Sequence, residues 1–322
     1  MRSNHTLLAL ALAAAYFSGS AAADAPKVAQ KATYKVGFAQ TESNNPWRLA
    51  ETKSFKDVAA SCGWQIIFTD AGGSAAKQVA DIDSLIAQKV DLLVFPPRED
   101  KPLIPAVMKA KKAGIPVILV DRDVDHKLAK PGVDYITFIG SDFIDQGRRA
   151  ADALVKATGG KANIIELEGT TGASAATDRK KGFDAEIAKH PGMKIVASQS
   201  GDFNRDKGRQ LAQTLLQAHP DANAVYGHND EMAVGAITAI EAAGKVPGKD
   251  IFVVSIDGQR NALEAIIAGK MVATVQSSPY FGAISCKIAQ ASAKGEKIPA
   301  WVKVEDKIYD ISNAAKDLAE GF

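Results

Sequence analysis

The feature of this 322-residue chain that most restricts its fold is a regular alternation of short apolar runs and helix-like segments. The runs KVGFAQ, QIIFTD, DLLVF and IPVILV are rich in Val, Ile, Leu and Phe, and helical patterns separate them over about residues 47–60, 75–88 and 105–113. Near-continuous apolar strands are typical of parallel sheets whose two faces are both covered by helices. The spacing therefore predicts an open, doubly wound α/β fold.

The same rhythm restarts in the second half of the chain. The runs YITFIG, ANIIEL, KIVASQ, NAVYGH and IFVVSI are each followed by a helical segment. No Pro/Ser-rich or low-complexity linker separates the two halves. The sequence thus predicts two α/β domains that meet closely at a cleft.

The N-terminal segment has the layout of a secretory signal. Arg2 is followed by an apolar run from Leu7 to Phe17 and by small residues that end at Ala23. We expect cleavage near Ala23, which removes residues 1–23 as a signal peptide and leaves a soluble exported protein. A short membrane anchor is the alternative, although the run is too short to span a bilayer.

The two cysteines of the sequence, Cys62 and Cys286, leave two interpretations open. An oxidising compartment allows a disulfide between them, and two buried free thiols fit the sequence at least as well. A zinc site is not expected, because there is no third cysteine and no histidine nearby.

Charge and motifs argue against several classes of function. The net charge of +2 gives no electrostatic reason to expect nucleic acid or an anionic membrane as a partner. The chain has no GxxxxGK[ST] phosphate loop, no GxSxG elbow and no HExxH motif. The segment DRDVD lacks the Gly and the distal Glu of a calcium loop. We therefore expect no cofactor, no metal site and no enzyme activity.

Polar and aromatic side chains follow most of the predicted strands, at the edge where open α/β sheets bind ligands. The run IPVILV, for example, leads directly into Asp121 and Arg122. Carboxylates accept hydroxyl protons, guanidinium groups donate in a planar fork, and aromatic rings pack against the C–H faces of a sugar. The sequence therefore predicts a hydroxyl-binding site. The residues at these strand ends are Gln40, Ser43, Asn44, Asn45, Trp47, Arg48, Arg98, Asp121, Arg122, Asp123, Thr170, Thr171, Ser174, Arg179, Asp202, Phe203, His228, Asn229, Asp230, Asp257 and Gln259.

Single residues in this set have a purely structural alternative, because Asp or Asn after a strand often caps the next helix. We interpret Ser174 as such a cap, Arg205 as part of a solvated face and His228 as a packing residue. Asp123 and Asp125 fit solvated loop charges. The convergence of several strand ends, more than any one residue, supports a binding site.

Six ordered motifs resemble a known family. NNPWR, VDRD, GASAATDRKKGF, SQSGDFNRDKG, HNDEMAVGAI and SIDG together are similar to the periplasmic sugar-binding proteins of the ribose-binding type, the solute receptors of ABC importers. The resemblance covers essentially the whole chain after the signal. WRLAET, ATDRKKGF and SQSGDF look most like the galactofuranose-binding members.

The resemblance implies a type I periplasmic binding protein fold, with two doubly wound parallel-sheet domains joined by three crossovers. The first lobe then comprises residues 33–140 with 278–305, and the second comprises 141–277 with 306–322. Phe203 matches a ring-stacking aromatic position. The site residues that the resemblance implies are Asn45, Trp47, Arg48, Asp121 and Arg122 in the first lobe, Arg179, Phe203, Asn229 and Asp257 in the second, and Ser277.

Departures from the ribose receptors favour a furanose. Arg48 stands where those receptors have an aromatic residue, and Ser277 stands where they use Gln. We therefore expect a monomeric periplasmic receptor that delivers galactofuranose or an arabinose-like sugar to an ABC permease in the inner membrane. A receptor for chemotaxis or a sensor kinase is an alternative, and a sugar-processing enzyme is a weaker one. A transcriptional regulator would need a DNA-binding motif before residue 33, where the export signal lies.

Overall fold

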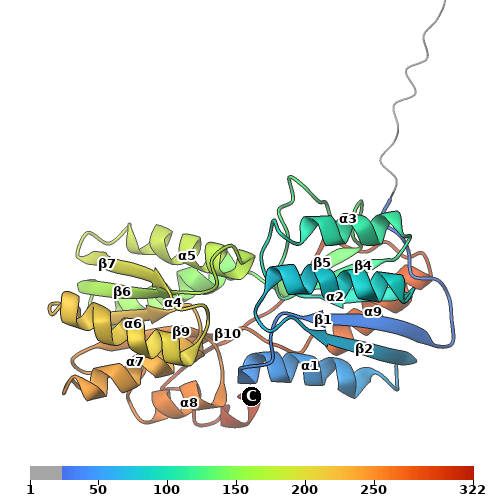
Figure 1. The fold of residues 1–322 in the computed structure, drawn as a ribbon. Coiled ribbons are helices and arrows are strands. Elements are labelled where there is room, and N and C mark those ends of the chain that lie inside the picture. Colours follow the sequence, from blue (N-terminus) through green and yellow to red (C-terminus); the bar gives the residue numbers. More distant parts are fainter. Residues whose placement is uncertain (1–23) are drawn as a thin grey trace, which may run out of the picture.

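The computed structural model describes residues 24–322, and the predicted signal peptide, residues 1–23, lies outside the described residues. The described chain forms two lobes that lie side by side (Figure 1), and each lobe is built on a six-stranded sheet. Helices cover both faces of each sheet. The prediction of two doubly wound α/β lobes is therefore confirmed.

Three neighbouring strands of the first sheet, β3, β4 and β5, are fully buried. β3 and β4 are buried at every residue, which explains why their sequences are unbroken runs of apolar side chains. All neighbouring strands in this sheet are parallel. Its order is β11 (Trp301–Val304), β5 (Thr137–Ser141), β4 (Val117–Val120), β3 (Leu92–Phe95), β1 (Tyr34–Gln40) and β2 (Trp64–Asp70).

The second sheet repeats this plan, with one antiparallel strand at an edge. β12 pairs antiparallel with β10, and the other pairs are parallel. The order is β12 (Ile308–Asp310), β10 (Ala273–Gln276), β9 (Phe252–Asp257), β8 (Ala224–Gly227), β6 (Ala162–Glu168) and β7 (Met193–Ser200).

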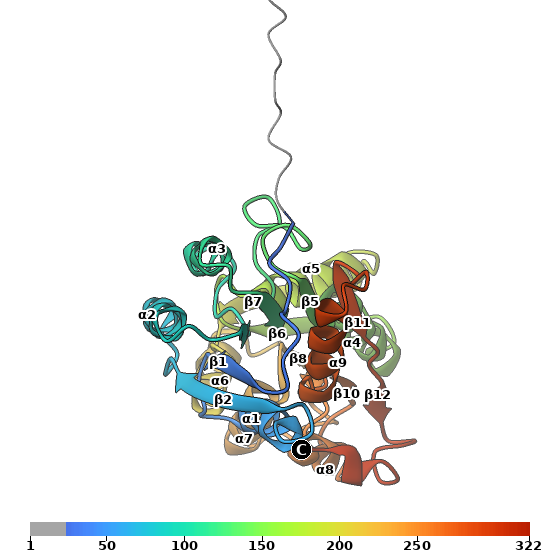
Figure 2. The same ribbon diagram turned by 90° about the vertical axis from the view of Figure 1, so that its right-hand side faces the viewer.

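Separate hydrophobic cores form on the two faces of each sheet. In the first lobe, α2 (Ala75–Ala87) and α3 (Ile104–Lys112) pack on one face, and α1 (Pro46–Val58) and α9 (Gly282–Ala293) pack on the other. Figure 2 shows α2 and α3 on one side of this lobe and α9 on the other. In the second lobe, α4 (Phe143–Thr158) and α5 (Ser174–Ile187) oppose α6 (Arg205–Ala218), α7 (Asp230–Ala242) and α8 (Arg260–Ile267), with η1 (Leu318–Glu320) beside α8.

Within residues 24–322, the chain passes between the two sheets three times. The first passage joins β5 to α4 at Asp142, the second follows β10 over residues 277–281, and the third joins β11 to β12 over residues 305–307. The run YITFIG, which the rhythm of the sequence placed at the start of the second half, contributes β5 to the first sheet instead. We propose the lobe boundaries at these passages: 33–140 with 278–305, and 141–277 with 306–322.

A disulfide joins Cys62, just after α1, to Cys286 on α9. The alternative of two free thiols is therefore wrong. Sequence alone left the choice open because the two α carbons, 224 residues apart in the chain, approach to 6.1 Å only in the folded lobe. In the part of the chain that the structure describes, no helix combines the length and the apolar character that a membrane crossing requires.

Candidate functional site

A cavity lies between the two lobes, at the carboxyl ends of their strands. It holds about 350 Å³ of empty space, including the part open to solvent, which is at the lower end of the range for small-molecule sites. Nine of the ten residues predicted for the site line this one cavity, and Ser277 does not. The lining residues are Glu42, Asn45, Trp47, Arg48, Asp121, Arg122, Ala175, Arg179, Phe203, Asn229 and Asp257.

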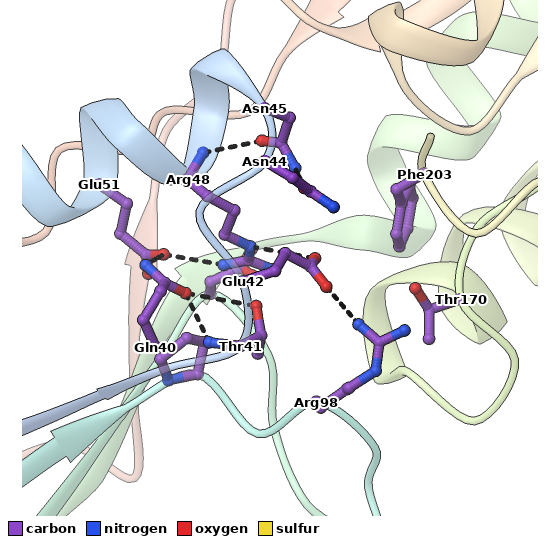
Figure 3. A network of polar contacts seen from close by, with 12 residues as sticks. Gln40, Thr41, Glu42, Asn44, Asn45, Arg48, Glu51, Arg98, Thr170 and Phe203 are labelled. Carbon is purple, nitrogen blue, oxygen red and sulfur yellow. Dashed lines mark hydrogen bonds and ion pairs between the residues drawn. The ribbon is translucent and has the colours of Figure 1, made fainter. Parts of the chain in front are cut away.

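The start of α1 places three lining residues on the first-lobe wall. The Asn45 side chain caps the helix by accepting a hydrogen bond from the Arg48 backbone N–H at 2.9 Å, and Pro46 follows the cap (Figure 3). Trp47 is held from the other side, because its indole N–H donates to the Ser277 carbonyl at 2.8 Å. This cap therefore fixes both the aromatic ring and the guanidinium that follow it.

Arg48 is the centre of a buried ion-pair network in this wall. Its guanidinium lies 2.7 Å from Asp121 Oδ2 and donates to Glu51 Oε2 at 2.8 Å. Gln40 donates to the same Glu51 oxygen at 3.0 Å (Figure 3). Burial, opposed by Arg48 and reinforced by Asp121, raises the pKa of the Glu51 carboxyl to about 7. One guanidinium thus holds two carboxylates away from water.

A second part of the network surrounds Glu42. Arg98 donates to the Glu42 carboxylate (Figure 3), and Arg48 and Arg122 each place a nitrogen 3.9 Å from its other oxygen. Burial and the neighbouring Arg48 lower the pKa of Arg122 to about 10, so Arg122 keeps its charge at neutral pH. Three guanidinium groups therefore share this carboxylate.

The end of β4 shows how the chain passes from a buried strand to charged residues without a turn residue. Asp121 has φ 59°, in the left-handed region, and its N–H still bonds to the Ile139 carbonyl of β5 at 2.9 Å. The Arg122 guanidinium donates to the Arg98 carbonyl at 3.1 Å. The bend at Asp121 turns both side chains toward the cavity, and the sheet holds it in place.

The second-lobe wall holds Arg179 from three directions. Its guanidinium donates to the His228 carbonyl at 2.7 Å and to Gln146 Oε1 at 3.0 Å, and lies 3.6 Å from Asp257 Oδ1. Burial, opposed by Arg179, raises the pKa of Asp257 well above its usual value. Asn229 caps α7 through Met232 N–H at 3.0 Å. It also lines the cavity, so a cap and a site residue are here the same side chain.

Phe203 supplies the aromatic face of this wall. Its ring lies 5.3 Å from the Arg122 guanidinium of the first lobe and 5.8 Å from that of Arg179. Phe203 and Asp202 both have φ 56°, and Asp257 has φ 139°. Residues 24–322 contain five non-glycine residues with positive φ, and all except Lys89 lie at the cavity or its rim. Strained backbone of this kind concentrates at binding sites.

Contacts between the lobes surround the cavity. At the rim, Arg98 of the first lobe donates to Asp202 of the second at 3.0 Å. Further along the same rim, the Asp123 backbone N–H donates to Ser174 Oγ at 2.8 Å. The interpretation of Ser174 as a cap is therefore wrong, because Ala173 occupies that position and the Ser174 hydroxyl bridges the two lobes. The two lobes therefore touch each other at the rim of the cavity.

Other residues singled out in the sequence are structural. His228 is fully buried and its Nε2 lies 3.0 Å from Glu166 Oε1, as expected for a packing residue. Arg205 is half-buried rather than part of a fully solvated face, because it pairs with the buried Glu231. Asp123 is not a free loop charge, because its carboxylate accepts the Tyr135 hydroxyl at 2.9 Å.

The sequence reasoning overlooked two lining residues and misplaced one. Glu42 lies in the segment QTESNNPWR that contains Trp47 and Arg48. Its place in the site could not be predicted, because it follows from the three guanidinium groups that surround it in the folded protein. Ala175 gave no signal, because it is a small apolar residue at a helix start. Ser277 contributes its carbonyl to Trp47, and its side chain does not line the cavity.

The family model of the periplasmic binding protein domain matches residues 36–297. The chain belongs to the periplasmic binding protein family. This confirms the family that the six sequence motifs indicated.

Three relatives cover nearly the whole chain. The galactofuranose-binding protein YtfQ of Escherichia coli (strain K12) is 36% identical over 297 residues, which span 91% of this chain and 92% of that protein. The arabinose transporter component of Shewanella sp. ANA-3, solved with α- and β-L-arabinofuranose, has a TM-score of 0.84 at 37% identity and covers 89% of this chain and 95% of its own. A Mycobacterium smegmatis structure with β-D-fucofuranose has a TM-score of 0.85 at 41% identity, and the match covers 89% of this chain and 94% of that one.

Proposed function

We propose that this protein is a periplasmic receptor that binds a neutral monosaccharide in its furanose form and delivers it to an ABC importer. The observation that carries the proposal is the cavity between the lobes, whose walls combine guanidinium groups, carboxylates, a carboxamide and the Phe203 ring. Vicinal hydroxyls need donors and acceptors in alternation, and the ring offers a face for C–H groups. A site of this kind rejects analogues that lack a hydroxyl, because buried groups are then left unpaired.

The pairing of the charged groups in the cavity wall supports a neutral ligand. Each guanidinium group of the first-lobe wall lies within ion-pair distance of a carboxyl group of the same wall, and Arg179 of the second lobe lies beside Asp257. A sugar acid or an amino sugar adds a buried charge that has no free partner. The matched first-lobe groups are Arg48, Arg98 and Arg122 with Glu42, Glu51 and Asp121.

The ring form is supported by the relatives and by one residue. The names of three relatives include galactofuranose, L-arabinofuranose and D-fucofuranose. Arg48 puts a guanidinium donor on the cavity wall beside Trp47. A donor at this position can bind the hydroxyl on the exocyclic carbon of a furanose. An aromatic residue at the position of Arg48 would leave no room for that hydroxyl.

Closure of the two lobes would be the working step. The contacts of Arg98 with Asp202, and of Asp123 with Ser174, join the lobes only when the cleft is shut. A bound sugar adds contacts to both walls and shifts the protein toward this closed form. The closed form then presents both lobe surfaces to a permease, and we expect a monomer with about micromolar affinity, or about −8 kcal/mol.

Binding without turnover is the expected behaviour. The buried carboxylates that line the cavity are paired with guanidinium groups, and His228 lies outside the lining. Neither arrangement supplies a general acid and base poised on a bound sugar. A receptor for chemotaxis or a sensor kinase would use the same closure.

Titration calorimetry tests the proposal. The mature protein is titrated with methyl β-D-galactofuranoside, methyl β-D-galactopyranoside, L-arabinose, D-ribose, myo-inositol and D-galacturonate, and each sample is assayed for turnover. We expect 1:1 binding of the furanoside or of L-arabinose, weak or no binding of galacturonate, and no products. Preference for the pyranoside would overturn the ring assignment, and binding of galacturonate would overturn the neutral-ligand assignment. No binding across the panel would overturn the receptor proposal.

A further inference from the structure

Gln146, in the first turn of α4, connects the cavity to the passages between the lobes. Its side chain is buried and makes three hydrogen bonds. The carboxamide oxygen accepts from Arg179 Nε at 3.0 Å, and the nitrogen donates to Asp306 Oδ2 at 2.8 Å and to the Gln276 carbonyl at 3.1 Å. The oxygen of this carboxamide therefore holds a residue of the cavity wall, and its nitrogen holds residues at the passages between the lobes.

The partners of Gln146 belong to the three passages. Gln276 ends β10, where the second passage starts, and Asp306 lies within the third. Ser141, at the end of β5 where the first passage starts, donates its hydroxyl to Asp306 Oδ1 at 3.2 Å. Gln146 and Asp306 thus tie together all three connections between the lobes.

The charges on either side fix the direction of these hydrogen bonds. A guanidinium only donates, so the oxygen of Gln146 must face Arg179 and its nitrogen must face Asp306. Arg149 of α4 donates to the Asp306 carbonyl at 2.9 Å, and Arg149 and Arg179 are the cations that face the Asp306 carboxylate. Burial raises the pKa of Asp306 to about 6, against the hydrogen bonds from Gln146 and Ser141. At neutral pH the carboxylate therefore accepts from Gln146.

We propose that Gln146 and Asp306 are positioning residues, which hold Arg179 in its sugar-binding orientation and couple it to the three passages between the lobes. The inference rests on the proposed function, because it treats Arg179 as a sugar-binding group. Neither positioning residue lines the cavity. Their effect on a sugar must therefore pass through Arg179.

A double-mutant cycle tests whether Gln146 affects sugar binding through Arg179. Wild type, Gln146→Leu, Arg179→Met and the double variant are titrated with L-arabinose and D-galactose. We expect Gln146→Leu to weaken binding about 10- to 100-fold in the wild type and less than about two-fold in the Arg179→Met background. Equal losses in both backgrounds would mean a general structural role and would overturn the inference.

Gln78 provides a matched control. It is also a buried glutamine with three hydrogen bonds, to Ala39, Pro96 and Arg98, and all three go to backbone groups. Gln78→Leu removes a similar set of contacts without touching Arg179. Its effect is expected to add to that of Arg179→Met.

Exchanging the carboxamide and the carboxylate keeps the contacts of residue 146 with Arg179 and with residue 306, and it loses the hydrogen bond to the Gln276 carbonyl. Gln146→Glu alone brings a second carboxylate against Asp306, and we expect affinity to fall more than about ten-fold at pH 8 because the two like charges repel. Adding Asp306→Asn supplies a carboxamide N–H to the introduced carboxylate, so affinity should return to within about three-fold of wild type. Failure of this rescue in a folded double variant would contradict the positioning role.

A measurement without sugar separates this inference from the proposed function. The Arg179 Nε–H resonance is followed by 15N NMR in the wild type and in the Gln146→Leu and Gln78→Leu variants. We expect a changed chemical shift and faster hydrogen exchange of Arg179 Nε–H in Gln146→Leu, and no change in Gln78→Leu. If the wild type binds no sugar of the calorimetry panel, the proposed function fails, but this resonance still tests the contact between Gln146 and Arg179. An unchanged resonance in Gln146→Leu would overturn the inference.

Discussion

The two walls of the cavity hold their binding groups by different means. In the first lobe, charged side chains hold one another: Arg48 binds Asp121 and Glu51, and Arg98 binds Glu42. In the second lobe, the His228 carbonyl and the Gln146 carboxamide hold Arg179. Its carboxyl partner, Asp257, lies further away at 3.6 Å. A substitution in the first wall therefore removes a charge shared by several buried partners, whereas loss of Arg179 leaves Asp257 alone without its cation.

The largest effect is expected from Arg48→Met in the first wall. Two buried carboxylates, Asp121 and Glu51, lose their cation, and we expect stability to fall by about 3–5 kcal/mol. Sugar affinity should fall about 100- to 1000-fold. Urea denaturation and calorimetry measure the two losses. Lys53→Met on the same helix is the control, since its exposed pair with Asp57 contributes less than about 1 kcal/mol. Equal losses of stability and affinity in Arg48→Met and Lys53→Met would contradict the role of the buried ion pairs in the first wall.

The next effect concerns the pH dependence of the same network. The folded protein binds the proton of Glu51 more tightly than the unfolded chain does, because its pKa rises from 4.5 to about 7. This stabilisation is complete below pH 4.5 and is lost as the pH rises through 7. Between pH 5 and pH 8, the free energy of unfolding of the wild type should therefore decline relative to Glu51→Gln, by at most about 3 kcal/mol. Parallel curves for the two proteins would show that Glu51 stays ionised throughout.

A smaller and local effect is expected from Gly169→Ala in the second wall. An added Cβ would lie 2.0 Å from Cζ of the Phe203 ring, so the ring must move from its position in the cavity wall. We expect about 1–3 kcal/mol loss of stability and about ten-fold weaker sugar binding. Adding Phe203→Leu makes room and should restore stability but not affinity. Unchanged binding in Gly169→Ala would mean that the ring position does not matter to the sugar.

The smallest effect is expected from Ser277→Ala. The residue holds Trp47 through its carbonyl, which every amino acid has, and its side chain does not line the cavity. Affinity should stay within about two-fold, since surface and non-contacting substitutions usually change little. A ten-fold loss measured by calorimetry would place the hydroxyl in the site after all.

The clearest of the predicted strands are those whose burial is extreme. β3 and β4 are apolar at every position because helices cover both faces, and such runs are readable without a structure. β10, β11 and β12 were not predicted: β10 has only four residues, and β11 and β12 are short edge strands in which every residue except Tyr309 is exposed or half-buried. The positions of the two edge strands depend on which neighbour has an open edge, and that is a property of the assembled sheet.

The site residues that were predicted from the sequence are mainly those that follow a recognisable strand. Asp121 and Arg122 follow a buried strand directly, so their placement at the sheet edge comes with the strand. Glu42 and Gln146 have no such signal, since their roles depend on guanidinium groups that lie dozens of residues away in the chain. Ser174 was misread because a hydroxyl at a helix start usually caps it, while here a partner from the other lobe competes for it.

The three passages between the lobes also set the order in which the molecule can be completed during synthesis. β11 finishes the first sheet and β12 finishes the second, and both come after residue 300. A nascent chain that stops before them has an unpaired edge at β5 and another at β10. Neither sheet is therefore complete until residues 301–310 have been made, and that short stretch completes both at nearly the same moment.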